Sequence, residues 1–127
     1  MYINLSQHCA TEDQKACGVF DINDENKKKL LVNCLNFNNI PDREEIEYKV
    51  EKIIEIAESE FPKDVEVKGA MIGGALWLMP PLARGLKQAG FTPFFAFSKR
   101  VVIETPFPDG SVKKEAVFKH MGFVEAF

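Results

Sequence analysis

The chain has 127 residues, a length typical of one domain, so we expect a single domain over residues 1–127. Hydrophobic residues make up 46% of it and charged residues 28%, which is ordinary globular composition with enough apolar material for one packed core. The net charge of −3 excludes the strongly basic class of proteins that bind duplex nucleic acid.

The N-terminal part of the chain predicts a strand followed by a short helix. Residues 2–5 are apolar and form the first predicted strand. Thr11 and Gln14 have the spacing of a capping box, in which the Thr hydroxyl accepts from a helix amide and the Gln side chain reaches back. A helix should therefore run from about residue 12 to residue 17, with Gly18 ending it.

A second short strand and two longer helices follow. Residues 19–22 form the strand, and Asp24 can cap the helix after it. The core face of that helix should carry Leu30, Leu31, Cys34 and Leu35. The clearest helix is residues 42–60, in which Glu45 and Lys49 are spaced as an i,i+4 ion pair. Its apolar residues at helical spacing are Ile46, Val50, Ile53 and Ala57.

The next stretch predicts a strand, a helix with a disturbed start, and another strand. Residues 67–72 are a candidate for a buried strand. Residues 75–89 have the apolar spacing of a helix, but Pro80 and Pro81 conflict with a smooth one, so we expect a kink or a late start. Residues 93–98 form the strand after this helix.

The C-terminal part predicts a β-hairpin, because the β-rich runs "RVVIETPF" and "SVKKEAVF" flank Pro-Asp-Gly. The element order β-α-β-α-α-β-α-β, followed by the hairpin, indicates an α/β domain with a mainly parallel central sheet flanked by helices. The hairpin would add antiparallel strands at one edge of that sheet.

The spacing of the cysteines and the length of the apolar stretches indicate the cellular compartment that we expect. Cys9, Cys17 and Cys34 are odd in number and form no C-x-x-C pair, so we expect neither a disulfide framework nor a zinc site. The N-terminus lacks a signal-peptide pattern, and residues 70–83 are too short for a membrane span. We therefore expect a reduced, cytoplasmic protein without metal, cofactor or membrane contact.

Aromatic composition and charge distribution give two further expectations. Eleven Phe against two Tyr and one Trp indicate that aromatic side chains, Trp77 included, lie mainly in the core. Residues 42–66 carry ten acidic and four basic side chains, which is typical of a solvated helix face. Residues 84–127 carry seven basic and four acidic ones, an excess that favours an anionic partner.

Small and polar residues follow three of the predicted strands. They are Ser6, Gln7 and His8 after the first strand, Gly73 and Gly74 after the strand of residues 67–72, and Ser98, Lys99 and Arg100 after the run "FFAF" of the strand at residues 93–98. Ligands of open α/β sheets bind outside the carboxyl ends of the strands. We therefore expect these three segments to meet on one rim.

An anion is the ligand that suits this rim best. Gly73 and Gly74 let the backbone approach an oxyanion closely, and the helix amides behind them carry partial positive charge. Arg100 can form a bidentate pair with a phosphate. His8, directly after a strand, can act as base, acid or phosphate donor.

Plainer interpretations stay open for the same residues. Gly73 and Gly74 match neither a dinucleotide-binding fingerprint nor a P-loop, and they could only relieve crowding between strand and helix. Lys99 could belong to a solvated turn. His8 could be an ordinary surface histidine, and His120, beyond the hairpin, could fold back to the site or merely cap the sheet edge.

Several stretches together resemble a known group of proteins. "NLSQHCATEDQ" resembles the N-S/T-x-H-x-x-T-x-x-Q opening of small proteins from type III CRISPR loci, and "MIGGALWLM", "PFFAFSKRVVIE" and "DGSVKKEAVFKHMGF" resemble their middle and end. These are compact CRISPR-associated, Rossmann-like accessory proteins, related to CARF domains and predicted to be ring nucleases. The resemblance covers about the first 18 residues and those from residue 70 onward.

The resemblance implies a Rossmann-like (CARF-like) fold, a homodimer, and a cyclic oligoadenylate ligand lying across the dimer axis. Some proteins of this group cleave that messenger without metal. Carried onto this chain, the ligand positions are Ser6, Gln7, His8, Gly73, Gly74, Ser98 and Arg100. For a ring nuclease, the catalytic residues would be His8, Ser98 and Arg100. His8 would be the base or acid, Arg100 with the glycine amides would hold the phosphate, and Ser6 and Ser98 would position the reacting groups. The alternatives are a nucleotide-binding module without chemistry and a protein-interaction module.

Overall fold

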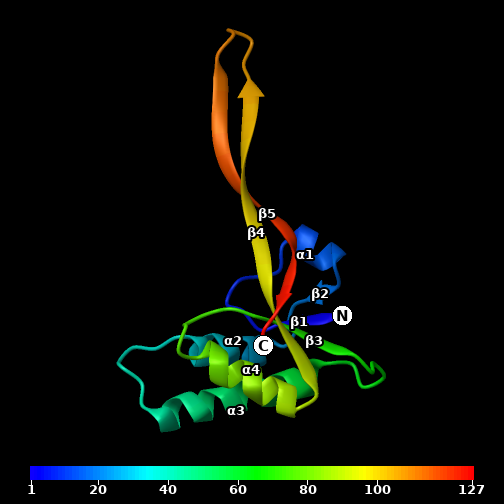
Figure 1. Ribbon diagram of the computed structural model, residues 1–127, viewed down its shortest axis with the longest axis vertical. Coiled ribbons are helices and arrows are strands. Elements are labelled where there is room, and N and C mark those ends of the chain that lie inside the picture. The colour runs from blue at the N-terminus through cyan, green and yellow to red at the C-terminus, as the bar shows by residue number, and fades with distance from the viewer.

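Five strands form one sheet in the order β2-β1-β3-β4-β5 (Figure 1). The computed structural model describes residues 1–127. The strands are β1 (Tyr2–Asn4), β2 (Val19–Phe20), β3 (Lys68–Ile72), β4 (Phe91–Pro106) and β5 (Val112–Glu125). Neighbouring strands from β2 to β4 pair in parallel, whereas β4 and β5 pair antiparallel. The fold is α/β as expected, but the sheet is mixed rather than mainly parallel.

The predicted strand at residues 93–98 and the first strand of the predicted hairpin are one continuous strand, β4. No glycine or proline interrupts the chain between Phe94 and Thr105, so the extended backbone runs on past Phe97. A register shift in the β4–β5 pairing lies between Phe97 and Ser98, where the hairpin leaves the sheet. The expectation of a loop at Ser98 was therefore wrong.

Four helices connect the strands and begin where the sequence predicts. They are α1 (Glu12–Ala16), α2 (Glu25–Leu35), α3 (Arg43–Glu60) and α4 (Met79–Gln88). Thr11 and Gln14 form the predicted capping box, and Asp24 accepts from two amides of α2. The late start of α4 is confirmed, with the two prolines placed in its first turn, where no amide donor is needed.

The main core lies between the sheet and the helices α2, α3 and α4, which cover one face (Figure 1). The side chains of Ile3 and Leu5 from β1 pack there with Ala70 and Ile72 from β3. Leu31, Cys34 and Leu35 of α2 are buried as expected, but Leu30 is 41% exposed. The other face of the sheet holds only a small cluster of Ala10, Val19 and Met71, with Tyr2 and Phe123 against it.

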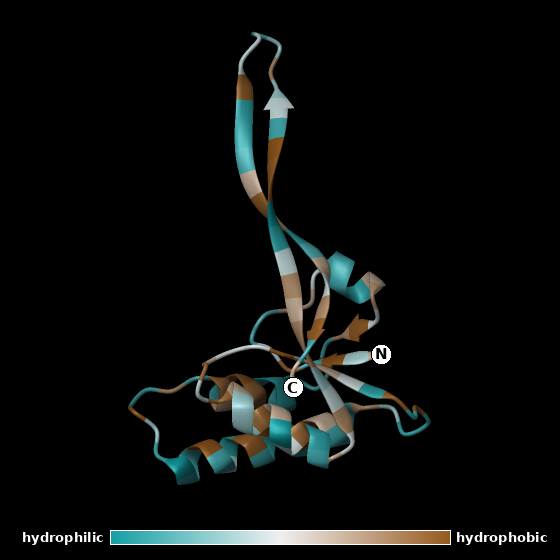
Figure 2. Ribbon diagram, in the orientation of Figure 1, coloured by the Kyte–Doolittle hydropathy of each residue, from teal (hydrophilic) through white to brown (hydrophobic).

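The end of the hairpin projects from the body as a two-stranded ribbon (Figure 1). We call residues Ser98–Met121 the arm. Short runs of apolar and polar residues follow one another along it, as the bands in Figure 2 show. Several of its apolar side chains are exposed, so the expectation that aromatic residues lie mainly in the core fails here. No helix of the chain is long and apolar enough to span a bilayer.

Candidate functional site

The carboxyl ends of β1 and β3 lie side by side, as the sequence predicts. Asn4 pairs with Met71 in the parallel ladder, and the Leu5 amide donates to the Met71 carbonyl at 2.9 Å. A Cβ placed on Gly73 would lie 3.9 Å from the Cβ of Ser6. The structure therefore brings the Ser6–His8 segment and the Gly73–Gly74 segment together at one edge of the sheet.

A buried asparagine fixes the loop after β1. Asn4 is only 4% exposed, and its Nδ2 donates to the His8 carbonyl at 2.8 Å and to Asp21 Oδ1 at 2.8 Å. Its Oδ1 accepts from the Ser6 amide at 2.9 Å and the Ser6 hydroxyl at 2.6 Å. These four residues, the Asn4 network, leave the His8 side chain exposed on a loop held by its backbone.

Asp21 is the charged member of this network and stands directly after β2. Its Oδ1 also accepts from the Ala10 amide at 3.0 Å. Burial alone would raise the pKa of Asp21, but the hydrogen bonds from Asn4 and Ala10 and the charges of Lys15 and Lys28 hold that pKa below its usual value. Neither Asn4 nor Asp21 was predicted as a site residue, although a polar residue in a short apolar strand was the available clue.

The segment after β3 offers free backbone donors. The amides of residues 73–77 donate no hydrogen bond to a protein acceptor. Gly74 has a φ of 150°, a conformation that L-residues with a side chain rarely adopt. These donors precede α4, whose own first turn offers no free donor, because the Met79 amide donates to the Ala75 carbonyl and residues 80 and 81 are prolines. Free amides next to a glycine with positive φ are features of a site for an oxyanion.

The third predicted segment lies on the arm. Ser98 stands opposite His120, Lys99 opposite Lys119, and Arg100 opposite Phe118. Because side chains alternate along a strand, Ser98 and Arg100 share one face while Lys99 lies on the other.

Distance along the strand also separates Arg100 from the glycines. Phe95 is the last residue of β4 that pairs with β3. Arg100 lies five residues beyond it, or about 17 Å at the rise of a strand. Ser98 and Arg100 therefore do not meet Gly73 in the manner of three adjacent loops.

His120 is brought beside Ser98 by the antiparallel pairing, which no local pattern in the sequence could indicate. Its ring lies 4.9 Å from the ring of Phe123, centroid to centroid. Both ring nitrogens are buried and have no hydrogen-bond partner in the protein. A buried imidazole without partners is costly, so a donor or acceptor from outside the chain would stabilise it.

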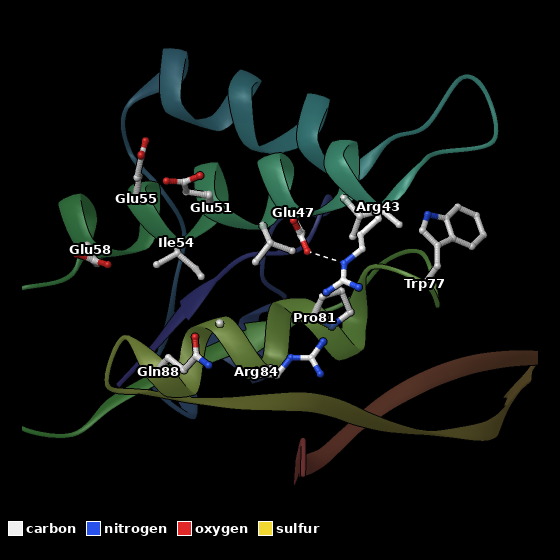
Figure 3. Close-up of a pocket in the computed structure, with 13 residues that line it drawn as sticks. Arg43, Glu47, Glu51, Ile54, Glu55, Glu58, Trp77, Pro81, Arg84 and Gln88 are labelled. Carbon is white, nitrogen blue, oxygen red and sulfur yellow. Dashed lines mark hydrogen bonds and ion pairs between the residues drawn. The ribbon is translucent and has the colours of Figure 1, made fainter.

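The best-formed hollow lies elsewhere, between α3 and α4 (Figure 3). We call it the α3–α4 groove. Its apolar lining residues are Ile46, Val50, Ile54, Trp77 and Pro81, and its acidic ones are Glu47, Glu51, Glu55 and Glu58. Arg43 stands beside Trp77 at one end and bonds Glu47 at 2.8 Å (Figure 3). Trp77 is 52% exposed, so the prediction of a core position was wrong, because α4 begins only after it.

Among the side chains described above, no three His, Cys, Asp or Glu residues converge as ligands of one metal ion.

Comparisons with other proteins place the chain in a family. No curated protein and no solved structure matches the chain. A family model does match, over residues 1–124, almost the whole sequence. The chain belongs to the family described as the "Uncharacterized protein MJ1673 family".

Proposed function

We propose that the protein binds cyclic oligoadenylate, the second messenger of type III CRISPR defence, and cleaves it as a metal-independent ring nuclease. In this proposal it is a cytoplasmic homodimer with a CARF-like, Rossmann-like fold. The motifs quoted above support the choice of messenger. The meeting of the Ser6–His8 and Gly73–Gly74 segments at one sheet edge is the observation that carries the proposal.

Free amides support the binding of a phosphate at this edge. The run of unpaired donors from residue 73 to residue 77 can surround phosphate oxygens at little cost in reorganisation. A side chain at Gly74 would be strained, which keeps the backbone bare there. Because the messenger carries several phosphates, Arg100 on the arm would hold a different phosphate from the one at Gly73.

Cleavage of such a ring needs no co-reactant. A ribose 2′-oxygen attacks the adjacent phosphorus, the bond from phosphorus to the 5′-oxygen breaks, and a 2′,3′-cyclic phosphate and a free 5′-hydroxyl result. A base takes the proton from the 2′-hydroxyl, and an acid returns one to the leaving oxygen. His8 is exposed at the rim and would serve as base or acid, and the glycine amides would stabilise charge on the phosphate.

The Asn4 network changes the roles of the remaining residues. The Ser6 hydroxyl donates to Asn4 at 2.6 Å, so Ser6 is a positioning residue that orients the His8 loop. Gln7 is exposed beside His8 and would contact a base or ribose. On the arm, Ser98 would contact the ligand together with Arg100, while Lys99 would add only long-range attraction because it lies on the opposite face.

The test is incubation of the purified protein with cyclic tetra- and hexa-adenylate in EDTA, with the products separated by chromatography. We expect linear products that carry a cyclic phosphate end. The His8→Ala variant should lose about 10²–10⁴-fold in turnover while the melting temperature still rises with ligand. Lys63→Ala, an exposed change in the loop after α3, is the control and should behave as wild type.

The outcomes separate this proposal from its rival, a nucleotide-binding module without chemistry. Intact ligand that raises the melting temperature would establish the rival. The absence of both products and thermal shift would contradict both. Both proposals use the same open edge of the sheet, which lies outside the three best-formed hollows, in the α3–α4 groove, at residues 37–41 and along α2.

A further inference from the structure

The arm lacks support from its own chain. Beyond Phe97 it is a two-stranded ribbon that points away from α3 and α4 (Figure 1). Val101, Val117 and His120 are partly exposed, and the other arm residues are exposed. Two-stranded ribbons of this kind are marginally stable in water. The arm therefore needs a surface to lie on.

One face of the arm is the more apolar. The cross-strand pairs place Phe118 and Val102 on the same face, with Ala116, Pro106 and Val112 further along it. We call this the Phe118 face. Phe118 is 77% exposed and Val102 63% exposed. A row of apolar side chains left in solvent on a projecting ribbon is the pattern of an interface.

The charge of the arm is positive. Five cations and three carboxylates lie between residues 98 and 121. Only Lys114 forms an ion pair, with Glu104 at 3.8 Å. Arg100 stands opposite Phe118 and is the unpaired cation of the Phe118 face, whereas Lys99 and Lys119 stand opposite each other on the other face. The partner of the arm should therefore be acidic as well as apolar.

The α3–α4 groove has this complementary chemistry. Its floor is apolar, and helix α3 carries seven glutamates against three cations. Glu47 is paired with Arg43 and Glu55 with Lys52, whereas Glu51 and Glu58 have no ion-pair partner. Gly85 lets the two helices approach, since a Cβ there would lie 2.6 Å from Ile54 Cδ1. The groove thus offers an apolar floor beside two unpaired carboxylates and the unpaired Arg84 of α4, and its four carboxylates exceed its two arginines.

The lengths of the two surfaces agree. The arm strand from Ser98 to Pro106 has nine residues, or about 30 Å at the rise of a strand. Helix α3 has 18 residues, or about 27 Å. Because the arm points away from its own groove, it can reach only the groove of another molecule. A two-fold axis lets each of two copies place its arm on the other.

We propose that the protein is a reciprocal dimer in which the Phe118 face of each arm lies in the α3–α4 groove of a second copy. This interface does not involve the Ser6–His8 loop or the glycines after β3. It shares with the proposed nucleotide site only Ser98 and Arg100 on the arm, and its test is dimerisation without nucleotide, so it stands whether or not the protein binds one.

The test is a charge swap followed by light scattering after size exclusion. Glu51→Lys with Glu58→Lys makes the groove basic, and Arg100→Glu with Lys114→Glu makes the Phe118 face of the arm acidic. Each double variant alone should dissociate, with a dimer Kd raised at least about tenfold. An equimolar mixture should form a heterodimer, because both of its interfaces then join opposite charges. Asp64→Lys with Glu66→Lys has the same charge change outside the groove and should stay dimeric.

Hydrogen exchange of the wild-type chain gives an answer that does not depend on the variants. Arm amides should become protected as protein concentration rises through the dimer Kd. A wild-type chain that stays monomeric, or a dimer that both double variants retain, would overturn the proposal. A heterodimer absent from the mixture of two folded variants would overturn it too.

Discussion

At the scale of single residues, the Asn4 network explains how a short strand and an irregular loop hold a fixed shape. One buried amide makes four hydrogen bonds, so its own polar atoms are satisfied and three chain segments are joined. Asp21 anchors it from the end of β2 through Asn4 and Ala10. The geometry of the proposed site therefore depends on residues that need not touch a ligand.

Replacing Asp21 by Ala should lower the free energy of unfolding by about 1–2 kcal/mol, because the Asn4 amide and the Ala10 amide lose their acceptor. The pKa of Asp21 is lower in the folded chain than in the unfolded one. The stability that its charge contributes is therefore fully present above the unfolded pKa of about 3.9. It is lost as pH falls through the lower folded pKa. The free energies of unfolding of the wild type and the variant, measured with denaturant from pH 7 to pH 2, should converge at low pH. A difference that stays constant with pH would show that the charge of Asp21 does not stabilise the network.

Thiol reactivity should sort the three cysteines by burial. Cys34 is buried in the core against α3, and burial raises its pKa although Lys49 and Lys52 oppose this. Cys9 and Cys17 are exposed. Alkylation of the native chain at neutral pH should modify two thiols quickly and the third only after denaturant is added. Rapid labelling of Cys34 in the native chain would show that α2 does not pack as described.

At the scale of elements, the groove between α3 and α4 depends on Gly85. In an exposed helix, Gly→Ala stabilises by about 0.5–1 kcal/mol. Here the new Cβ would lie 2.6 Å from Ile54 Cδ1 and 3.1 Å from Val50 Cγ1, and overpacking costs about 1–3 kcal/mol. We expect Gly85→Ala to lower the melting temperature and Gly85→Ala with Ile54→Val to restore it, because the second change removes the clashing methyl. A single variant more stable than wild type would contradict this packing.

Local patterns predicted most elements, since caps and helical spacing act within a few residues. Thr11 and Asp24 cap their helices as predicted, Asp42 caps α3 instead of starting it, and the Glu45–Lys49 pair forms at 3.4 Å. What failed depended on distant parts of the chain. The continuation of β4 past Ser98 requires β5 as its partner, and the exposure of Trp77 follows from where α4 begins.

The same limit applies to the candidate site: the part that depends on element order was predicted, and the part that depends on distant pairing was not. Ser6 and Gly73 meet because parallel strands end at a common edge, which the element order already indicates. The predicted position of Arg100 beside the glycines was wrong, because the sequence indicates the end of a strand at residues 98–100 whereas β4 continues to Pro106. His120 reaches Ser98 only through pairing across the bulge, for which the sequence holds no local pattern.

At the scale of the whole molecule, the chain consists of a helix-backed sheet and an arm with different tasks. The sheet edge supplies the proposed site for the nucleotide, and the arm with the α3–α4 groove supplies the proposed dimer interface. On the second sheet face, the ring of Tyr2 stacks on that of Phe123, and the ring of Phe94 packs at an edge-to-face angle against both. Binding at the edge and dimerisation can therefore be tested separately.

The central claim is that the edge formed by β1 and β3 binds a phosphate-bearing nucleotide. The most direct measurement is an amide NMR titration of the labelled chain with cyclic tetra-adenylate in EDTA. We expect saturable shifts at residues 6–8 and 73–77, with smaller ones at the base of the arm near Ser98. Shifts absent from both segments, or confined to the α3–α4 groove, would contradict the claim.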